Sequence, residues 1–232
     1  MELCIDTSTR YASVAISHQG EPLWETCWFS KRNHTVELAP TIQSLLGQAG
    51  ASLGDVEAIF LAVGPGGFSA LRVGMSAAKG IAEGLDIPLV GVGTLELEAF
   101  PYAETGRSLY PLLDVGRGEV AWAVYREDEG SWRQVHGPEI ASPEEVVAGA
   151  LPGAVYCGEG AWTHRDLLRE CADSSALVLA VPPPTRRGQA LARLGFLRLA
   201  EGAGADRDQL QPMYLRRPSI TMRSPRRAKT RL

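Results

Sequence analysis

One order of secondary-structure elements occurs twice along the chain, and this repeat constrains the fold more than any other feature. In each half an apolar strand ends in an aspartate that begins a polar or glycine-bearing turn, at Asp6 in the first half and at Asp114 in the second. Segments with the alternation or aromatic content of antiparallel strands follow, and then a helix, a strand and another helix. Strands alternating with helices in this order predict an α/β protein with two related lobes.

The spacing of apolar residues sets approximate limits for each element. The first lobe, predicted over residues 1–104, has strands at 3–5, 12–17, 23–29, 58–63 and 88–92, and helices at 37–48, 70–84 and 95–102. The second, smaller lobe, predicted over residues 105–215, has strands at 109–113, 120–125, 132–135 and 154–157, and helices beginning near Ser142 and spanning 163–171 and 186–201. Residues 216–232 are predicted to form a basic tail.

Charge is distributed unevenly between the tail and the rest of the chain. Seven of the 23 Lys and Arg residues, and no acidic residue, lie between Arg216 and Leu232, so the remainder carries a net charge of −11. An acidic body argues against a free-standing RNA-binding protein. The tail is either a flexible solubilising end or a segment that contacts phosphate. No apolar run approaches the roughly 18 residues that span a bilayer, and no signal-type apolar core begins the chain, so we expect a cytoplasmic protein.

Three loops that follow strands contain residues suited to phosphate. At the first, Asp6 could hold a metal ion through water while neighbouring hydroxyls and amides bind phosphate oxygens. The loop from Gly64 to Ser69 precedes a helix, whose amides and dipole favour anions, although it is not a P-loop. Each loop also suits an ordinary turn or a tight connection. The candidate phosphate-binding residues are Asp6, Thr7, Ser8, Gly64, Gly66, Gly67, Asp114 and Gly116.

The sequence contains no recognisable cluster of metal-ligating residues. Its four cysteines form no CxxC pair and have no histidine at ligand spacing, so we expect free thiols and no metal site. Glu96 and Glu98 are two residues apart in a predicted helix, where they do not share a face. We expect both carboxylates to be solvated.

The two longer helices of the first lobe offer a candidate partner surface. The helix at 70–84 is rich in small residues, which allow another helix to approach closely, and leftover apolar surface marks interaction sites. The same side chains could instead pack on the sheet, as one face of each helix must. A surface of this kind could also join two copies of the chain. The predicted partner-facing residues are Leu38, Ile42, Leu45, Leu71, Met75 and Ala78.

Several motifs, in order and at consistent spacing, resemble those of the TsaB family. The match is dense over residues 1–125 and patchy afterwards. The motifs are Ile5-Asp6-Thr7-Ser8-Thr9, Lys31-Arg32-Asn33-His34-Thr35, Val63 to Gly74, Pro88-Leu89-Val90-Gly91-Val92, Leu112-Leu113-Asp114 with Arg117-Gly118-Glu119-Val120, and Tyr214-Leu215-Arg216. The resemblance implies an actin-like or Hsp70-like ATPase fold, related to ribonuclease H, that is duplicated into two lobes with the second reduced.

The TsaB resemblance also implies a function. It identifies the chain as a non-catalytic subunit of the bacterial machinery that makes threonylcarbamoyladenosine on tRNA. Such a subunit pairs through its first lobe with a catalytic paralogue, TsaD, which modifies the adenosine next to the anticodon of tRNAs that read codons starting with A. An ATPase, TsaE, joins the pair, and tRNA is contacted indirectly through the complex. No cofactor is implied for the chain alone, although ATP or ADP could lie at the junction with its partners.

Two positions distinguish the chain from the catalytic paralogue. TsaD-like proteins carry a metal-binding HxxxH after the strand that matches Pro88–Val92, and the corresponding residues here are Thr94 and Glu98. One oxygen ligand in place of two imidazoles implies that the transition-metal site is lost. A small actin-fold ATPase or sugar kinase that uses Asp6 and Asp114 remains an alternative function. Metalloprotease activity is a third, which the missing HxxxH argues against.

Overall fold

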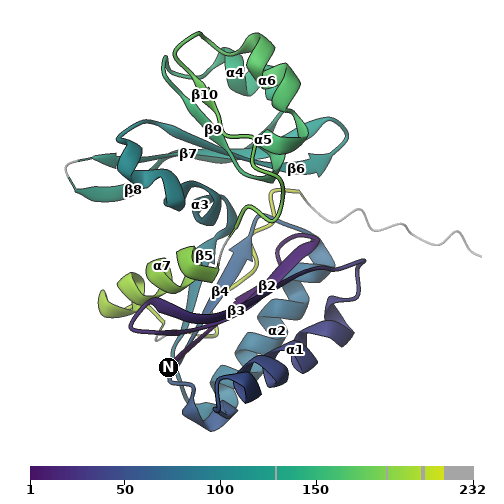
Figure 1. Cartoon of the computed structure of the whole chain (residues 1–232), viewed down its shortest axis with the longest axis vertical. Helices are drawn as coiled ribbons and strands as arrows, with labels where there is room; N and C mark the ends of the chain where they lie inside the picture. Colours follow the sequence, from purple (N-terminus) through teal and green to yellow (C-terminus); the bar gives the residue numbers. More distant parts are fainter. Residues whose placement is uncertain (129, 187, 205–206, 217–232) are drawn as a thin grey trace, which may run out of the picture.

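Two lobes, one above the other in Figure 1, make up the computed structural model of the chain, which describes residues 1–128, 130–186, 188–204 and 207–216. The rest of the predicted tail, 217–232, lies outside the described residues. Each lobe is built on a five-stranded sheet. The lower sheet contains β1 (Glu2–Asp6), β2 (Tyr11–His18), β3 (Glu21–Phe29), β4 (Ala58–Gly64) and β5 (Leu89–Gly93). The upper sheet contains β6 (Leu109–Gly116), β7 (Glu119–Asp128), β8 (Ser131–Ala141), β9 (Val155–Cys157) and β10 (Leu177–Val178).

The two sheets share one topology, which confirms the predicted duplication. In the lower sheet, ordered β3-β2-β1-β4-β5, the central β1 is antiparallel to β2 and parallel to β4. In the upper sheet, ordered β8-β7-β6-β9-β10, the central β6 is antiparallel to β7 and parallel to β9. Asp6 and Asp114 therefore hold equivalent places near the carboxyl ends of β1 and β6. The upper lobe is the reduced one, since β9 and β10 have only three and two residues.

Helices α1 (His34–Gln48) and α2 (Phe68–Leu85) lie side by side on one face of the lower sheet (Figure 1). The apolar side chains of each helix recur at three- and four-residue spacing, so they form a single stripe, and this stripe packs on the sheet. The choice of these side chains as a partner-facing set is therefore wrong, because the sheet itself covers them. All six are at most 6% exposed: Leu38, Ile42, Leu45, Leu71, Met75 and Ala78.

The last helix, α7 (Gly188–Ala200), covers the opposite face of the lower sheet. Its apolar residues Ala190, Leu191 and Leu194 enter the core formed with β1, β2, β4 and β5. Gly195 lies so close to the sheet that a Cβ there would stand 2.2 Å from the Phe60 ring. The predicted second lobe at 105–215 is therefore too long: the chain returns to the first lobe at α7, because that sheet has a second apolar face to bury.

The remaining helices connect or cover the upper lobe. Helix α3 (Thr94–Ala99) and the following 3₁₀ segment (Phe100–Thr105) lead from one sheet to the other, and α3 contacts strands of both. A short 3₁₀ turn (Leu53–Asp55) precedes β4. The upper sheet carries α4 (Pro143–Ala148), α5 (Glu159–Thr163) and α6 (Arg165–Cys171). Helix α4 begins with the predicted cap, in which Ser142 and Glu145 exchange hydrogen bonds.

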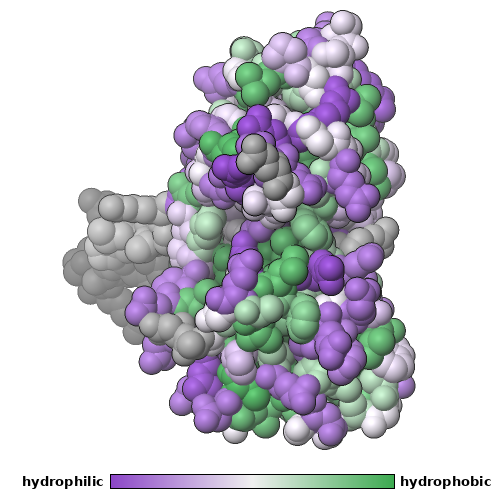
Figure 2. All heavy atoms as spheres, turned by 90° about the vertical axis from the view of Figure 1, so that its left-hand side faces the viewer, coloured by the Kyte–Doolittle hydropathy of each residue, from purple (hydrophilic) through white to green (hydrophobic). Residues whose placement is uncertain are grey.

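The side of the molecule that carries α7 has mixed surface character. Figure 2 shows hydrophobic side chains gathered across the middle of this side, between hydrophilic groups. Large apolar side chains exposed on the chain include Leu197 of α7 and Val135 of β8. Within the described residues, no helix is both long and apolar enough to cross a membrane.

Candidate functional site

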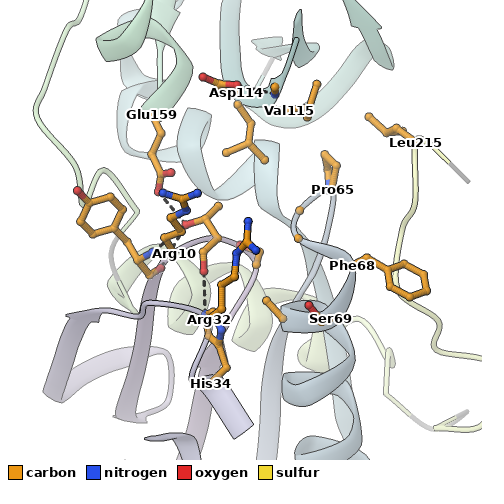
Figure 3. A pocket seen from close by; sticks show the side chains of 18 of the residues that line it. Arg10, Arg32, His34, Pro65, Phe68, Ser69, Asp114, Val115, Glu159 and Leu215 are labelled. Atoms are coloured by element: carbon orange, nitrogen blue, oxygen red, sulfur yellow. Dashed lines mark hydrogen bonds between the residues drawn. The ribbon is translucent and has the colours of Figure 1, made fainter. Parts of the chain in front are cut away.

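A cleft of about 1200 Å³ lies between the lobes, and residues of both predicted aspartate turns line it (Figure 3). We call it the interlobe cleft. Five of the eight predicted phosphate-binding residues line it: Ser8, Gly66, Gly67, Asp114 and Gly116. The other three do not. Asp6 and Thr7 are buried beneath the first turn, and Gly64 lies outside the cleft, close to the Met213 carbonyl.

The glycine loop before α2 is packed against the first turn. A Cβ on Gly66 would lie 2.2 Å from the carbonyl oxygen of Ser8, so only glycine fits there. The Gly67 N–H donates to the same oxygen at 2.8 Å. Helix α2 then begins without a side-chain cap, and Gly67 to Ala70 line the cleft. The first amides of a helix have no partner within it, so this end of α2 places a positive dipole at the cleft wall.

A buried arginine lies behind the first turn. The Arg186 side chain is 3% exposed and its Nε donates to Asp6 Oδ2 at 2.7 Å. Its Nη1 donates to Glu98 Oε1 and to Glu159 Oε1, both at 2.8 Å, and its Nη2 donates to Thr9 Oγ1 at 2.6 Å. We call these five residues the Arg186 cluster. They come from both lobes, so the cluster joins the lobes at the base of the cleft.

The charges in the Arg186 cluster do not balance, because three carboxylates surround one guanidinium. Burial lowers the pKa of Arg186, but the three carboxylates outweigh it and hold that pKa well above its usual value. Burial raises the pKa of Glu98 to about 7; Arg186 opposes this shift and the charge of Glu159 adds to it. The Oε2 atom of Glu98 has no hydrogen-bond partner among the described residues. Arg186 and the partial protonation of Glu98 at neutral pH together reduce the excess of negative charge in the cluster.

The expectation that Glu96 and Glu98 are solvated is wrong. The two residues are 8% and 2% exposed. Glu98 joins the Arg186 cluster, and Glu96 pairs with Arg198 of α7. Helix α3 lies between the two sheets, so both of its faces are covered, and two residues on different faces can both be buried.

The residues near the cleft do not fit a metal-bound nucleotide. Asp6 Oδ1 accepts the N–H and hydroxyl of Ser8 at 2.8 and 2.6 Å, and Oδ2 accepts from Arg186, whose positive charge balances this carboxylate and repels a metal ion. Asp114 is exposed and accepts the Gly116 N–H at 2.6 Å. Within the ranges that the structure describes, no three His, Cys, Asp or Glu residues are grouped as a metal site. Thr94 and Glu98 are buried, but the neighbouring guanidinium repels a cation.

Sequence reasoning missed the arginines of the site. Arg186 lies far along the chain from the turn that it neutralises, and no local pattern marks it. The side chains of Arg10, Arg32 and Arg117 are exposed, line the cleft, and form no hydrogen bond or ion pair with any residue that the structure describes. Figure 3 shows the Arg10 and Arg32 side chains reaching into the cleft from the lower lobe. For two of them a signal was available, since Arg10 follows the first turn directly and Arg117 lies in the turn after Asp114.

Comparison with known proteins gives consistent results. The family model described as TsaD: tRNA N6-adenosine threonylcarbamoyltransferase matches residues 29–189. The chain is 36% identical to the tRNA threonylcarbamoyladenosine biosynthesis protein TsaB of Escherichia coli over 149 residues, which cover 62% of this chain and 63% of that protein, slightly less than two thirds. It is 28% identical to the Bacillus subtilis protein of the same description over 217 residues, covering 92% and 93% of the two chains.

A solved structure agrees with these sequence comparisons. YeaZ from Pseudomonas aeruginosa superposes with a TM-score of 0.75 at 28% identity, covering 92% of this chain and 99% of that one. Together with the repeated strand order, this likeness confirms the predicted two-lobed actin-like α/β fold.

Proposed function

This chain belongs to the TsaB family, and on that basis we propose that it is a non-catalytic subunit that activates a TsaD-type transferase. The transferase adds a threonylcarbamoyl group to the adenosine next to the anticodon of tRNAs that read codons beginning with A. The complex works in the cytoplasm together with a TsaE-type ATPase, and tRNA reaches this chain only through the complex. ATP or ADP lies at the junction of the subunits.

The observation that carries the non-catalytic role is the Arg186 cluster. Metal-assisted phosphoryl transfer at the end of β1 would need an aspartate there that is free to hold a metal ion, because the ion offsets the phosphate charge. Here both oxygens of that aspartate, Asp6, already accept hydrogen bonds from protein groups, one of them from a buried guanidinium. The equivalent Asp114 is exposed and bonded to its own turn. The environments of Asp6 and Asp114 are both consistent with an activating role in which this cleft catalyses no reaction.

We place the TsaD-type subunit on the outer face of α1 and α2. The inner stripe of both helices is buried, whereas Val36 is 71% exposed and Ala39 is exposed on the same helix. On α2, a Cβ added at Gly80 or Gly84 would meet nothing within 4 Å, so another helix could approach the backbone closely. The same face would join two copies of this chain when no TsaD-type subunit is present.

Reconstitution tests the activating role. A TsaD-type subunit, a TsaE-type ATPase, substrate tRNA, ATP and the threonylcarbamoyl donor are combined with and without this chain, and modified adenosine is quantified. We expect modification to depend on the chain, while the chain alone hydrolyses no ATP. Modification that proceeds equally without it would refute the proposal. Magnesium-dependent ATP hydrolysis by the chain alone would favour the alternative of an independent ATPase or sugar kinase that uses Asp6 and Asp114.

A matched pair of variants tests the docking face. Ala39→Arg places a long charged side chain on the outer face of α1, and Ala148→Arg makes the same change at an exposed position of α4 in the upper lobe. We expect Ala39→Arg to abolish co-elution with the TsaD-type subunit and Ala148→Arg to leave it intact, with both variants folded by circular dichroism. If Ala39→Arg still forms the complex, the subunits meet elsewhere.

A further inference from the structure

We propose that residues 207–216 form a strap that clamps the two lobes to each other and fixes the angle between them. The strap crosses from the lower lobe to the upper lobe at the edge of the interlobe cleft, where Tyr214, Leu215 and Arg216 are part of the cleft wall. A fixed angle presents both lobes to a partner as one rigid surface, so binding does not have to order them first. The proposal goes beyond the activating role and does not require it.

The strap begins with an anchor on the lower lobe, at the end of α2. Arg207 Nη1 donates to the Ala82 carbonyl and Nη2 donates to Asp86 Oδ1, both at 2.8 Å. A cation at this end of a helix is stabilised by the helix dipole. Further along the strap, the Met213 N–H donates to the Val63 carbonyl of β4 at 2.7 Å. The strap is therefore bonded to the lower lobe at two separate points.

Two glycines of the lower lobe leave the space that the strap occupies. A Cβ on Gly91 would lie 2.7 Å from Leu210 Cδ1, and a Cβ on Gly64 would lie 2.7 Å from the Met213 carbonyl oxygen. Both glycines lie on strands of the lower sheet, β5 and β4. A glycine within a strand allows another segment to approach the backbone closely. The strap is thus packed into the lower lobe rather than laid over its surface.

Tyr214 holds the strap against the start of α2. Its ring centroid lies 4.8 Å from that of Phe68, and Arg72 Nε donates to its hydroxyl at 3.1 Å. The Arg72 guanidinium also lies 3.9 Å from the centroid of the Phe68 ring. Ring contacts and cation–π contacts stabilise beyond the area that they bury. Tyr214 therefore cannot leave α2 without breaking both its ring contact and its hydrogen bond.

The next two residues of the strap contact the upper lobe. Leu215 packs against an apolar cluster that includes Leu109 of β6. The Arg216 guanidinium pairs with Glu119 of β7, and these side chains are 37% and 35% exposed. A pair this exposed contributes little, so the burial of Leu215 supplies most of the stabilisation. Because consecutive Cα atoms are only about 3.8 Å apart, the lobes cannot separate at this edge while Tyr214 and Leu215 both stay in place.

A second connection between the lobes lies on the other side of the cleft. The Arg186 cluster joins Asp6 of the lower lobe to Glu159 of the upper lobe. Figure 3 shows Leu215 and Glu159 on opposite sides of the cleft. Two connections on opposite sides oppose rotation of one lobe against the other, whereas a single connection would act as a hinge. The Arg186 cluster is buried and the strap is partly exposed, so the strap can be changed without disrupting the core.

Distance measurements between two spin labels on the full-length chain test the proposal. One label is attached to Cys171 of α6 in the upper lobe and the other to Ser44→Cys of α1 in the lower lobe, and both positions are exposed. Cys27→Ser prevents a third label, and Cys4 and Cys157 are buried and stay unlabelled. We expect a single narrow distribution of distances, because the strap holds the lobes at one angle.

A double variant and a matched control assign the fixed angle to the strap. Leu215→Ser combined with Arg216→Ser removes both contacts with the upper lobe, and we expect the distance distribution to widen at least about twofold. Leu151→Ser combined with Arg169→Ser makes the same changes at exposed positions of the upper lobe outside the strap. This control should leave the width of the distribution unchanged. Circular dichroism shows whether both variants remain folded.

Charge reversal gives a second test that leaves the core unchanged. Arg216→Glu places a carboxylate beside Glu119, and adding Glu119→Arg restores a pair of opposite charges. We expect Arg216→Glu to widen the distribution by less than the double variant does, and the added Glu119→Arg to narrow it again.

Two results would overturn the proposal. These are a double variant with the width of the unchanged chain, and a control that widens as much as the double variant. If the double variant does not fold, the charge reversal decides alone, and an unchanged width in Arg216→Glu would overturn the proposal. None of these results bears on activation of a TsaD-type subunit, which the reconstitution assay measures separately.

Discussion

The turn at Asp6 and the turn at Asp114 end equivalent strands of the two lobes, and they have opposite environments. Asp6 is 3% exposed and accepts hydrogen bonds from Ser8 and from the buried Arg186. Asp114 is exposed and accepts from the Gly116 N–H of its own turn. The duplicated backbone preserved the position of the aspartates but not their chemistry. The difference arises because residue 186 lies on a segment that returns to the lower lobe.

Removing the guanidinium should produce the largest effect. Arg186→Met leaves three carboxylates without a buried counter-ion, and breaking a buried ion pair costs about 3–5 kcal/mol. We expect a loss of this size in the free energy of unfolding, measured with urea. A loss below about 1 kcal/mol would mean that water screens the charges of the cluster. The electrostatic environments of Asp6 and Asp114 would then differ less than their burial suggests.

The pH dependence of stability should reveal Glu98. Its pKa is about 7 in the folded chain and 4.5 as an ordinary Glu. The stabilisation from its protonated form is complete below pH 4.5 and is lost as pH rises through about 7. Between pH 5 and pH 8 the loss should be on the order of 2–3 kcal/mol. Glu98→Gln should flatten the unfolding free energy over this range.

The control for Glu98 is an exposed carboxylate. Glu170→Gln on α6 removes a charge that is not buried, so the slope between pH 5 and pH 8 should match that of the unchanged chain. If Glu98→Gln keeps the same slope as Glu170→Gln, Glu98 is already ionised at pH 5 in the folded chain.

Alanine substitutions of one glycine beside each turn should separate packing from backbone strain. A Cβ on Gly66 would meet the Ser8 carbonyl at 2.2 Å, so Gly66→Ala must displace the first turn. We expect this to lower the free energy of unfolding by about 1–3 kcal/mol. Gly116 has a φ of +78° and nothing within 4 Å of an added Cβ, so Gly116→Ala should cost only about 1 kcal/mol of backbone strain. Urea unfolding of both variants gives the comparison. Equal losses of unfolding free energy in the two variants would indicate that the first turn can shift to accommodate the added Cβ at little cost.

The smallest effect should come from the second aspartate. Asp114→Asn keeps an oxygen that can accept the Gly116 N–H at an exposed position, so we expect a change within about 0.5 kcal/mol. The free energy of unfolding at pH 7 measures it. A larger loss would show that Asp114 has a charged partner, and the contrast with Asp6 would need revision.

The sequence by itself determined the repeated order of strands and helices, the glycine loop before α2 and the cap at Ser142. Each of these depends on residues a few positions apart, whose spacing fixes which side chains share a face. The same spacing located the apolar stripe of α1 and α2, but it could not say whether the sheet or a partner covers that stripe. The strand β10, with two residues, was too short to produce a pattern.

Tertiary structure alone decided the charge of the site. Arg186 meets Asp6 from 180 positions away along the chain and Glu98 from 88, distances over which no periodicity links residues. The return of α7 to the lower sheet brings Arg186 there, because that sheet has two apolar faces and α1 and α2 cover only one. Burial then fixes which carboxylates need a counter-ion, and burial is a property of the assembled lobes rather than of any local segment.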